Sequence, residues 1–254
     1  GIDQKERIQR QQEIDVVINC AAVVSFDALL DEALSLNVFA ADRIAKFAES
    51  CDASVLVHVS TAYVNGVVHK NPAEAPYHDL PKDNKNHFTP GYFRDVYQDI
   101  EKVESIIKDV YRQATSEAQE REFTLRLLKE SRKKKRQRPS RKNRLAQIRK
   151  AWIQEQLRQS GMQWARERGW NDTYTYTKAM GEQLVLAACK TVSAVILRPS
   201  VIESSLWEPC PGWLDGLRMA DPLIAAIGKG RLKSLPLDPN VLLDLVPVDV
   251  VVNA

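Results

Sequence analysis

Hydrophobic residues along this chain follow two periods, one typical of buried strands and the other of helices. Short runs rich in valine and isoleucine at 14–22, 53–60 and 192–198 predict buried parallel strands. Apolar residues at helical spacing predict helices over 29–49, 93–112, 151–168, 179–189 and 221–227. This alternation of strand and helix predicts an α/β fold with a doubly wound parallel sheet.

Three segments fall outside that alternation. Residues 65–91 hold four prolines and several Asn and Asp, so they predict an irregular surface excursion. Residues 207–213 predict a rigid loop of tryptophan and proline. Near the end of the chain, the Pro247-Val248-Asp249 sequence predicts Asp249 as the N-cap of a final helix. The chain begins on a short polar segment and stops inside the apolar run 250–254. We therefore expect a piece of a longer protein.

Charge is unevenly distributed, although the net charge is only +3. Residues 129–150 carry twelve lysines and arginines against one acid, Glu130. Such a segment can bind nucleic acid, acidic lipid or phosphorylated ligands. The segment contains no aromatic residue, and the first one after it is Trp152. This argues against a platform on which the bases of a single-stranded nucleic acid would stack. The favoured interpretation is a solvated helical insertion over about 129–160, broken at Pro139-Ser140. Peripheral membrane association stays open as an alternative.

The four cysteines form no CxxC pair and have no histidine cluster nearby, so we expect reduced thiols, a cytoplasmic location and no metal site. No apolar run reaches the roughly 18 residues of a membrane span. The polar, charged N-terminus shows no secretory signal.

Tyr174 and Lys178 are four residues apart just before the predicted helix 179–189, and on a helix this spacing puts them one turn apart on one face. A free tyrosine has a pKa of about 10, and a nearby cation favours its phenolate. The pair could therefore exchange a proton with a carbonyl near neutral pH. The pattern is short, and a plain surface pair is the alternative.

Two predicted strands end in residues suited to a ligand. The first ends in Asn19 and the small residues that follow it, which let a ligand approach the backbone. The second ends in Ser60 and Thr61, whose hydroxyls can hydrogen-bond a substrate. For the small residues after Asn19, the alternative is packing against a helix. For the hydroxyls of Ser60 and Thr61, the alternative is turn or cap chemistry. We interpret His58, inside the second strand, as a packed histidine.

Four motifs carry a resemblance to a known family. They are Val59-Ser60-Thr61-Ala62-Tyr63, Tyr174-Thr175-Tyr176-Thr177-Lys178, Leu197-Arg198-Pro199-Ser200 and Glu208-Pro209-Cys210-Pro211-Gly212-Trp213. In this order the chain resembles the extended short-chain dehydrogenase/reductase family. More narrowly, it resembles the alcohol-forming fatty acyl-CoA reductases of the male sterility type. The resemblance covers nearly the whole chain except the basic segment.

The resemblance implies a role for individual residues. Tyr174 would protonate the carbonyl oxygen, and Lys178 would stabilise its phenolate and bind the nicotinamide ribose. Thr61, with Ser60 as the second candidate, would hold the substrate oxygen. Asn37 would support a proton relay. The residues implied to lie along the cofactor are Asn19, Ala21, Ala22, Tyr174, Lys178, Pro199 and Ser200.

The implied activity is reduction of a fatty acyl-CoA thioester by NADPH to an aldehyde, an alcohol or both. The alternatives are a reductase of carrier-protein thioesters, another extended short-chain dehydrogenase or epimerase, and a nucleic-acid or membrane-surface binder that uses the basic segment. We do not favour nucleic acid as a partner. The implied domains are a partial, Rossmann-like NAD(P)-binding domain over 1–200 and a small substrate-side region over 201–254.

The glycine-rich phosphate loop of such folds is missing from this sequence, because none of the ten glycines follows a strand in that spacing. We therefore expect that the first βαβ units precede this chain, and that the chain alone binds dinucleotide poorly.

Overall fold

The computed structural model describes residues 13–51, 55–66, 95–131, 140–217, 220–236 and 242–254, with single residues 3, 11, 238 and 240. Most of the predicted irregular excursion and the centre of the basic segment lie outside these ranges. The chain forms two compact units, which are described one at a time. Unit 1 comprises Gly1–His58 and Val64–Ile196, and unit 2 comprises Val59–Tyr63 and Leu197–Ala254.

A three-stranded sheet contains the strands that the sequence predicted. Its order is β1 (Val16–Asn19), β2 (Val55–Val59) and β3 (Ser193–Leu197). β1 and β2 are parallel, and Asn19 lies opposite His58 at the carboxyl end of β1. The three predicted strands are confirmed, and β1 and β3 are shorter at both ends than their apolar runs. The last residues of β2 and β3 belong to unit 2.

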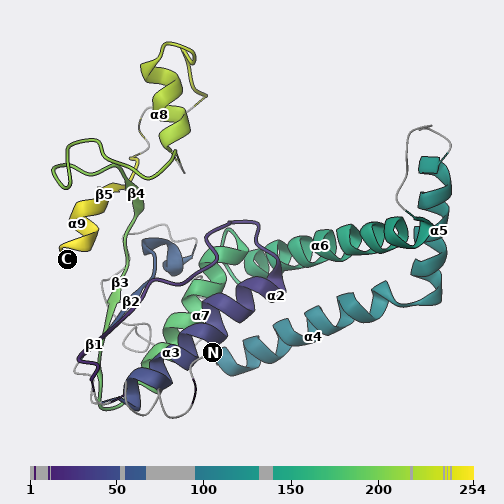
Figure 1. Ribbon diagram of the computed structural model, residues 1–254, viewed down its shortest axis with the longest axis horizontal. Helices are drawn as coiled ribbons and strands as arrows, with labels where there is room; N and C mark the ends of the chain where they lie inside the picture. Colours follow the sequence, from purple (N-terminus) through teal and green to yellow (C-terminus); the bar gives the residue numbers. More distant parts are fainter. Residues whose placement is uncertain are drawn as a thin grey trace. The chain divides into compact units, whose positions relative to one another are not determined.

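Two helical segments of unit 1 pack with the sheet (Figure 1). The first is continuous and comprises α2 (Leu30–Ala33), the π-helical η1 (Leu34–Phe39) and α3 (Ala40–Glu49). The second is α7 (Thr173–Ala188). The core between α3, α7 and the sheet is built from small and branched residues: Ala41, Ala45, Ala48, Leu56, Val185 and Val192. The predicted α/β fold with parallel strands is therefore confirmed.

Three long helices form an arm of unit 1 (Figure 1). They are α4 (Val96–Ala114), α5 (Glu117–Ser131) and α6 (Arg141–Glu167). α4 begins at Asp95, whose carboxylate accepts the N–H groups of Tyr97 and Gln98. The inner ends of α4 and α6 join a larger core with α2, η1 and α7, which includes Leu30, Val38, Ile100, Val103, Ala165, Trp170, Met180 and Leu184. This core ties the arm to the helix that carries Tyr174.

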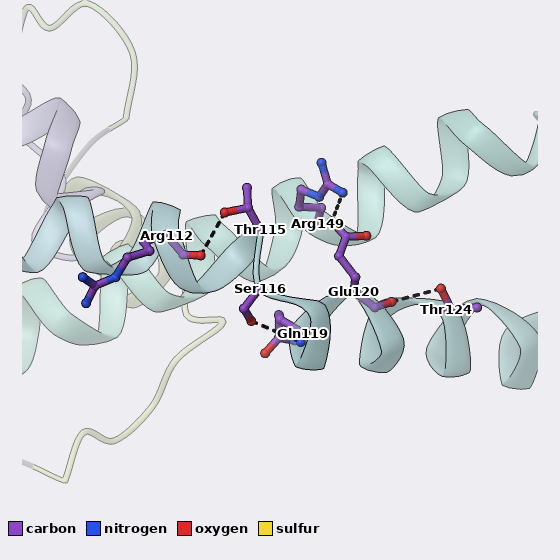
Figure 2. Close-up of polar contacts among 7 residues, drawn as sticks. All are labelled: Arg112, Thr115, Ser116, Gln119, Glu120, Thr124 and Arg149. Carbon is purple, nitrogen blue, oxygen red and sulfur yellow. Dashed lines mark hydrogen bonds and ion pairs between the residues drawn. The ribbon is translucent and has the colours of Figure 1, made fainter.

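The turn between α4 and α5 is held by local hydrogen bonds (Figure 2). Thr115 donates to the carbonyl of Arg112 at 2.9 Å, and the Ser116 hydroxyl accepts the N–H of Gln119 at 3.3 Å. Arg149 on α6 pairs with Glu120 on α5 (Figure 2). A small separate core of Phe123, Leu127 and Ile148 packs α5 on α6. The arm therefore has apolar contacts of its own, away from the sheet.

The described residues of unit 2 include a parallel pair of short strands and two helices. The strands are β4 (Val201–Glu203) and β5 (Leu245–Pro247), and the helices are α8 (Asp221–Gly228) and α9 (Val248–Val252). The predicted helix at 221–227 is confirmed. A short 3-10 turn, η2 (Ala62–Asn65), follows β2 where the chain passes back into unit 1.

The predicted role of Asp249 is wrong. The N-cap position of α9 is Pro247, and no side chain caps this helix. The carboxylate of Asp249 instead accepts three consecutive backbone N–H groups, those of Leu206, Trp207 and Glu208, at 2.9, 2.8 and 3.1 Å. These three charge-assisted bonds hold the carboxylate more strongly than a single cap could.

Candidate active site

The start of α7 places Tyr174 and Lys178 one turn apart on one face, as the spacing predicted. The carboxylate of Asp172 accepts the N–H of Thr175 at 2.8 Å and so fixes where the helix begins. Tyr174 is half-buried and its ring meets that of Phe26 edge-on, with centroids 6.1 Å apart. Its hydroxyl therefore belongs to a side chain that packing orients but does not bury.

Lys178 is only 1% exposed, which is rare for a lysine. Burial is the main cause that lowers its pKa, to about 8, while the charges of Glu182 and Cys20 act in the opposite direction. Loss of solvation disfavours the ammonium more than the neutral amine. The amine can therefore change its protonation state near physiological pH.

Tyr176 lies two residues further along α7 and belongs to the core. It is fully buried, accepts the indole N–H of Trp164 at 3.0 Å and donates to Asp99 at 3.4 Å. Burial is the main cause that raises its pKa far above the usual value for tyrosine. Of the two tyrosines, Tyr174 is therefore the one suited to proton transfer.

Asn19, one of the residues predicted to lie along the cofactor, is buried at the carboxyl end of β1. The side chain of Asn19 is 3% exposed; its oxygen accepts the N–H of Ala21 at 3.2 Å and its nitrogen lies 2.9 Å from Nδ1 of His58. Ala21 is exposed and Ala22 is half-buried. Both side chains are small, and their place along a cofactor stays a prediction.

His58 contacts Lys178, and the sequence did not predict this contact. Its Nε2 lies 3.5 Å from the amine of Lys178, and the side chain is 1% exposed. Burial first, and then the charge of Lys178, lower its pKa to about 3. The prediction of a packed histidine is therefore correct as to burial, but it missed the contact with Lys178.

Asn37 joins η1 to α7 and to the loop after β1. Its side-chain oxygen accepts the N–H of Val23 at 2.8 Å, and its nitrogen donates to Thr177 at 3.0 Å. A β-carbon on Gly181 would collide with the backbone carbonyl of Asn37. The π-helical turn thus brings its backbone directly against the helix that carries Tyr174 and Lys178. The relay role implied for Asn37 stays a prediction.

The remaining predicted site residues belong to unit 2. The N–H groups of Ser60 and Ala62 donate to the carbonyls of Leu197 and Pro199 at 2.7 and 2.9 Å, so Thr61 lies beside the chain that follows β3. Thr61 is buried, and its hydroxyl accepts the N–H of Tyr63 at 3.4 Å.

Ser60, Pro199 and Ser200 complete this group. The buried hydroxyl of Ser60 has no hydrogen-bond partner among the described residues. Pro199 is buried and Ser200 is half-buried. A common site for Thr61 and Tyr174 stays a prediction, because they lie in different units.

The described ranges contain no cluster of three or more His, Cys, Asp and Glu side chains able to hold a metal ion. Within the same ranges, no helix combines the length and the apolar character that a membrane crossing needs. All four cysteines are free.

Comparison with known proteins identifies the family. The profile of an NAD-binding family described as "Male sterility protein" matches residues 1–254. Two Arabidopsis thaliana proteins, fatty acyl-CoA reductases 8 and 1, are each 35% identical over 99% and 100% of this chain. The alcohol-forming fatty acyl-CoA reductase of Simmondsia chinensis is 30% identical over 100% of it. The chain spans 43–44% of these relatives. It therefore belongs to the male sterility protein family of NAD-binding domains.

Proposed function

We propose that the full-length protein reduces a fatty acyl-CoA thioester with a nicotinamide cofactor. The observation that carries the proposal is the buried amine of Lys178, one turn from the half-buried Tyr174 at the start of α7. The names of the relatives, which are fatty acyl-CoA reductases, support the substrate class.

Tyr174 acts as the general acid in this proposal. Its hydroxyl gives a proton to the thioester carbonyl oxygen, and the nearby cation of Lys178 stabilises the phenolate that remains. The Thr61 hydroxyl accepts the N–H of Tyr63, so its own proton is free to be donated to the same carbonyl oxygen. The resulting hemithioacetal releases the CoA thiol and leaves an aldehyde, and a second reduction gives the alcohol.

The cofactor, when bound, supplies the hydride for each reduction. Small residues at Ala21 and Ala22, the amine of Lys178, and Pro199 with Ser200 are the groups that would hold its nicotinamide half. NADPH rather than NADH is part of this proposal, and a comparison of kcat/KM for the two cofactors tests it. A cytoplasmic location, with or without peripheral membrane association, stays a prediction.

The test of Tyr174 is the Tyr174→Phe variant of the full-length protein. We expect turnover to fall by about 10²–10⁴-fold because the general acid is lost. We expect the dissociation constant for NADPH to change little, because the ring stays in place. Steady-state kinetics and a cofactor-binding titration measure the two effects.

Tyr176→Phe is the matched control on the same helix. It removes a buried hydroxyl that contacts Trp164 and Asp99, so we expect a stability loss of about 1–3 kcal/mol with turnover largely kept. Full activity in Tyr174→Phe, or equal losses of turnover in both variants, would contradict the role of Tyr174.

The substrate class has its own test. Acyl-CoA, acyl-carrier-protein and nucleotide-sugar substrates are compared by kcat/KM in the full-length protein. The proposal expects acyl-CoA to be preferred. A clear preference for either of the others moves the assignment to a carrier-dependent reductase or to a sugar-modifying enzyme of the extended short-chain family.

A further inference from the structure

A buried chain of polar contacts leads from the backbone after β1 to the amine of Lys178. The N–H of Ala21 donates to the oxygen of Asn19, the nitrogen of Asn19 contacts Nδ1 of His58, and Nε2 of His58 faces the amine of Lys178. The successive distances are 3.2, 2.9 and 3.5 Å. The three side chains are each at most 3% exposed. All members lie in unit 1.

The hydrogen-bonding capacities of these groups fix the tautomer of His58. A backbone N–H can only donate, so the oxygen of Asn19 must face Ala21 and its NH₂ group must face His58. Nδ1 of His58 therefore accepts, and a neutral imidazole then carries its proton on Nε2. Burial and the charge of Lys178 keep His58 neutral, since its pKa falls to about 3.

The proton on Nε2 points toward the nitrogen of Lys178. A neutral amine has a lone pair that can accept this N–H, whereas an ammonium presents only further donors. The arrangement therefore favours the neutral amine over the charged one. Two groups close to Lys178 favour the ammonium instead: Glu182, one turn further along α7, and Cys20, directly after β1. Tyr174 lies one turn before Lys178, so a change in the protonation state of Lys178 would change how strongly the Tyr174 phenolate is stabilised.

We propose that His58, oriented by Asn19, is a positioning residue that fixes the amine of Lys178 and makes its proton easy to release. This inference rests on the proposed function, because it assigns His58 a task in the same reductase site. His58 acts through Lys178 and does not touch the reacting carbonyl. The protonation state of Lys178 thereby depends on a contact between β2 and α7, which are 120 residues apart in sequence.

The test replaces His58 by glutamine in the full-length protein. The glutamine amide can turn its oxygen toward Lys178 and accept from the ammonium, which favours the charged form. We expect the pKa of Lys178 to rise by about one unit, as a hydrogen bond to a charged group implies. Lysine labelled with ¹³C at Cε reports this pKa by NMR titration, and the Lys178→Arg variant identifies the signal.

Two further variants separate the contact from a general loosening of the fold. His58→Asn is too short to reach Lys178 and admits water to the amine, so it too should raise the pKa of Lys178, which keeps the test available if the glutamine variant does not fold. Met180→Ala disturbs the buried part of α7 but keeps Asn19, His58 and Lys178, so it should leave that pKa unchanged.

Turnover gives the second readout. If activity needs the ammonium, it falls as the pH rises through the pKa of Lys178, near 8 in the natural protein. This limb should move to higher pH in His58→Gln. An unchanged NMR titration in both His58 variants, or a Lys178 that titrates near 10 in the natural protein, overturns the inference. If the natural protein does not reduce acyl-CoA although the NMR shift is observed, only the proposed function is overturned.

Discussion

The carboxylate of Asp249 binds the loop at 206–208 and does not cap the helix on which Asp249 lies. Its carboxylate accepts three N–H groups from residues about forty positions earlier in the chain. These hydrogen bonds stabilise the charged form, and the first of them, from Leu206, contributes most to lowering the pKa to about 2. The loop also carries Trp207 and Trp213, which are 66% and 44% exposed. The carboxylate thus fixes the backbone at Trp207, whereas the backbone of Trp213 bonds to Ser205.

This arrangement predicts a pH dependence of stability. The folded pKa of Asp249 lies below its unfolded value of about 3.9, so its contribution is complete above about pH 5 and is lost as the pH falls through the folded pKa near 2. Asp249→Asn should lower the urea midpoint at pH 7, and the gap from the natural protein should narrow between pH 4 and 2. Tryptophan fluorescence follows the unfolding.

Asp215→Asn is the control for Asp249, because Asp215 is an exposed carboxylate of the same unit. It should have little effect at any pH. A gap for Asp249→Asn that does not vary with pH would contradict the stabilising role of the carboxylate charge.

At the scale of elements, the contact between η1 and α7 leaves no room for a side chain. Gly181 faces the carbonyl of Asn37, whereas Gly228 at the end of α8 has no neighbour within 4 Å of an added β-carbon. Close packing of this kind is intolerant of added volume.

Gly181→Ala should therefore destabilise the protein by about 1–3 kcal/mol. Gly228→Ala should be neutral or slightly stabilising, because alanine favours helix and the added group meets nothing. Urea unfolding of both variants measures the difference. Equal stability of the two variants would show that η1 and α7 can move apart at little cost.

The sequence predicted the strands and helices of the sheet layer because periodicity is a local property. It also predicted the spacing of Tyr174 and Lys178, which depends on one turn of one helix. The partners of His58 and Asp249 could not be predicted in this way. Those partners lie 39, 120 and about 42 residues away, and no pattern within a window of helix or strand length contains both members.

At the scale of the whole molecule, positive charge is concentrated in residues 129–150, and the rest of the chain is net acidic. Part of this segment lies on α5 and α6, and Lys133 to Arg136 lie outside the described residues. A concentrated positive field can speed the encounter with a polyanion such as the phosphates of CoA.

Neutralising Lys133, Lys134, Lys135 and Arg136 should therefore raise KM for acyl-CoA at an ionic strength of about 0.01 M, where charges act over about 30 Å. The effect should vanish at about 1 M salt, where they act over about 3 Å. The control neutralises four exposed lysines elsewhere, Lys46, Lys108, Lys190 and Lys229. An unchanged KM at low salt would remove the segment from substrate capture.

Val59–Tyr63 belongs to unit 2, although the residues on both sides of it in the sequence belong to unit 1. The N–H groups of Ser60 and Ala62 bond to carbonyls that lie about 137 residues later in the chain. Hybrid proteins made by joining two relatives at a single crossover near residue 196 would therefore pair a Ser-Thr segment from one parent with an Arg-Pro-Ser segment from the other. Recombination that keeps the two segments together has to exchange 59–63 along with the C-terminal part.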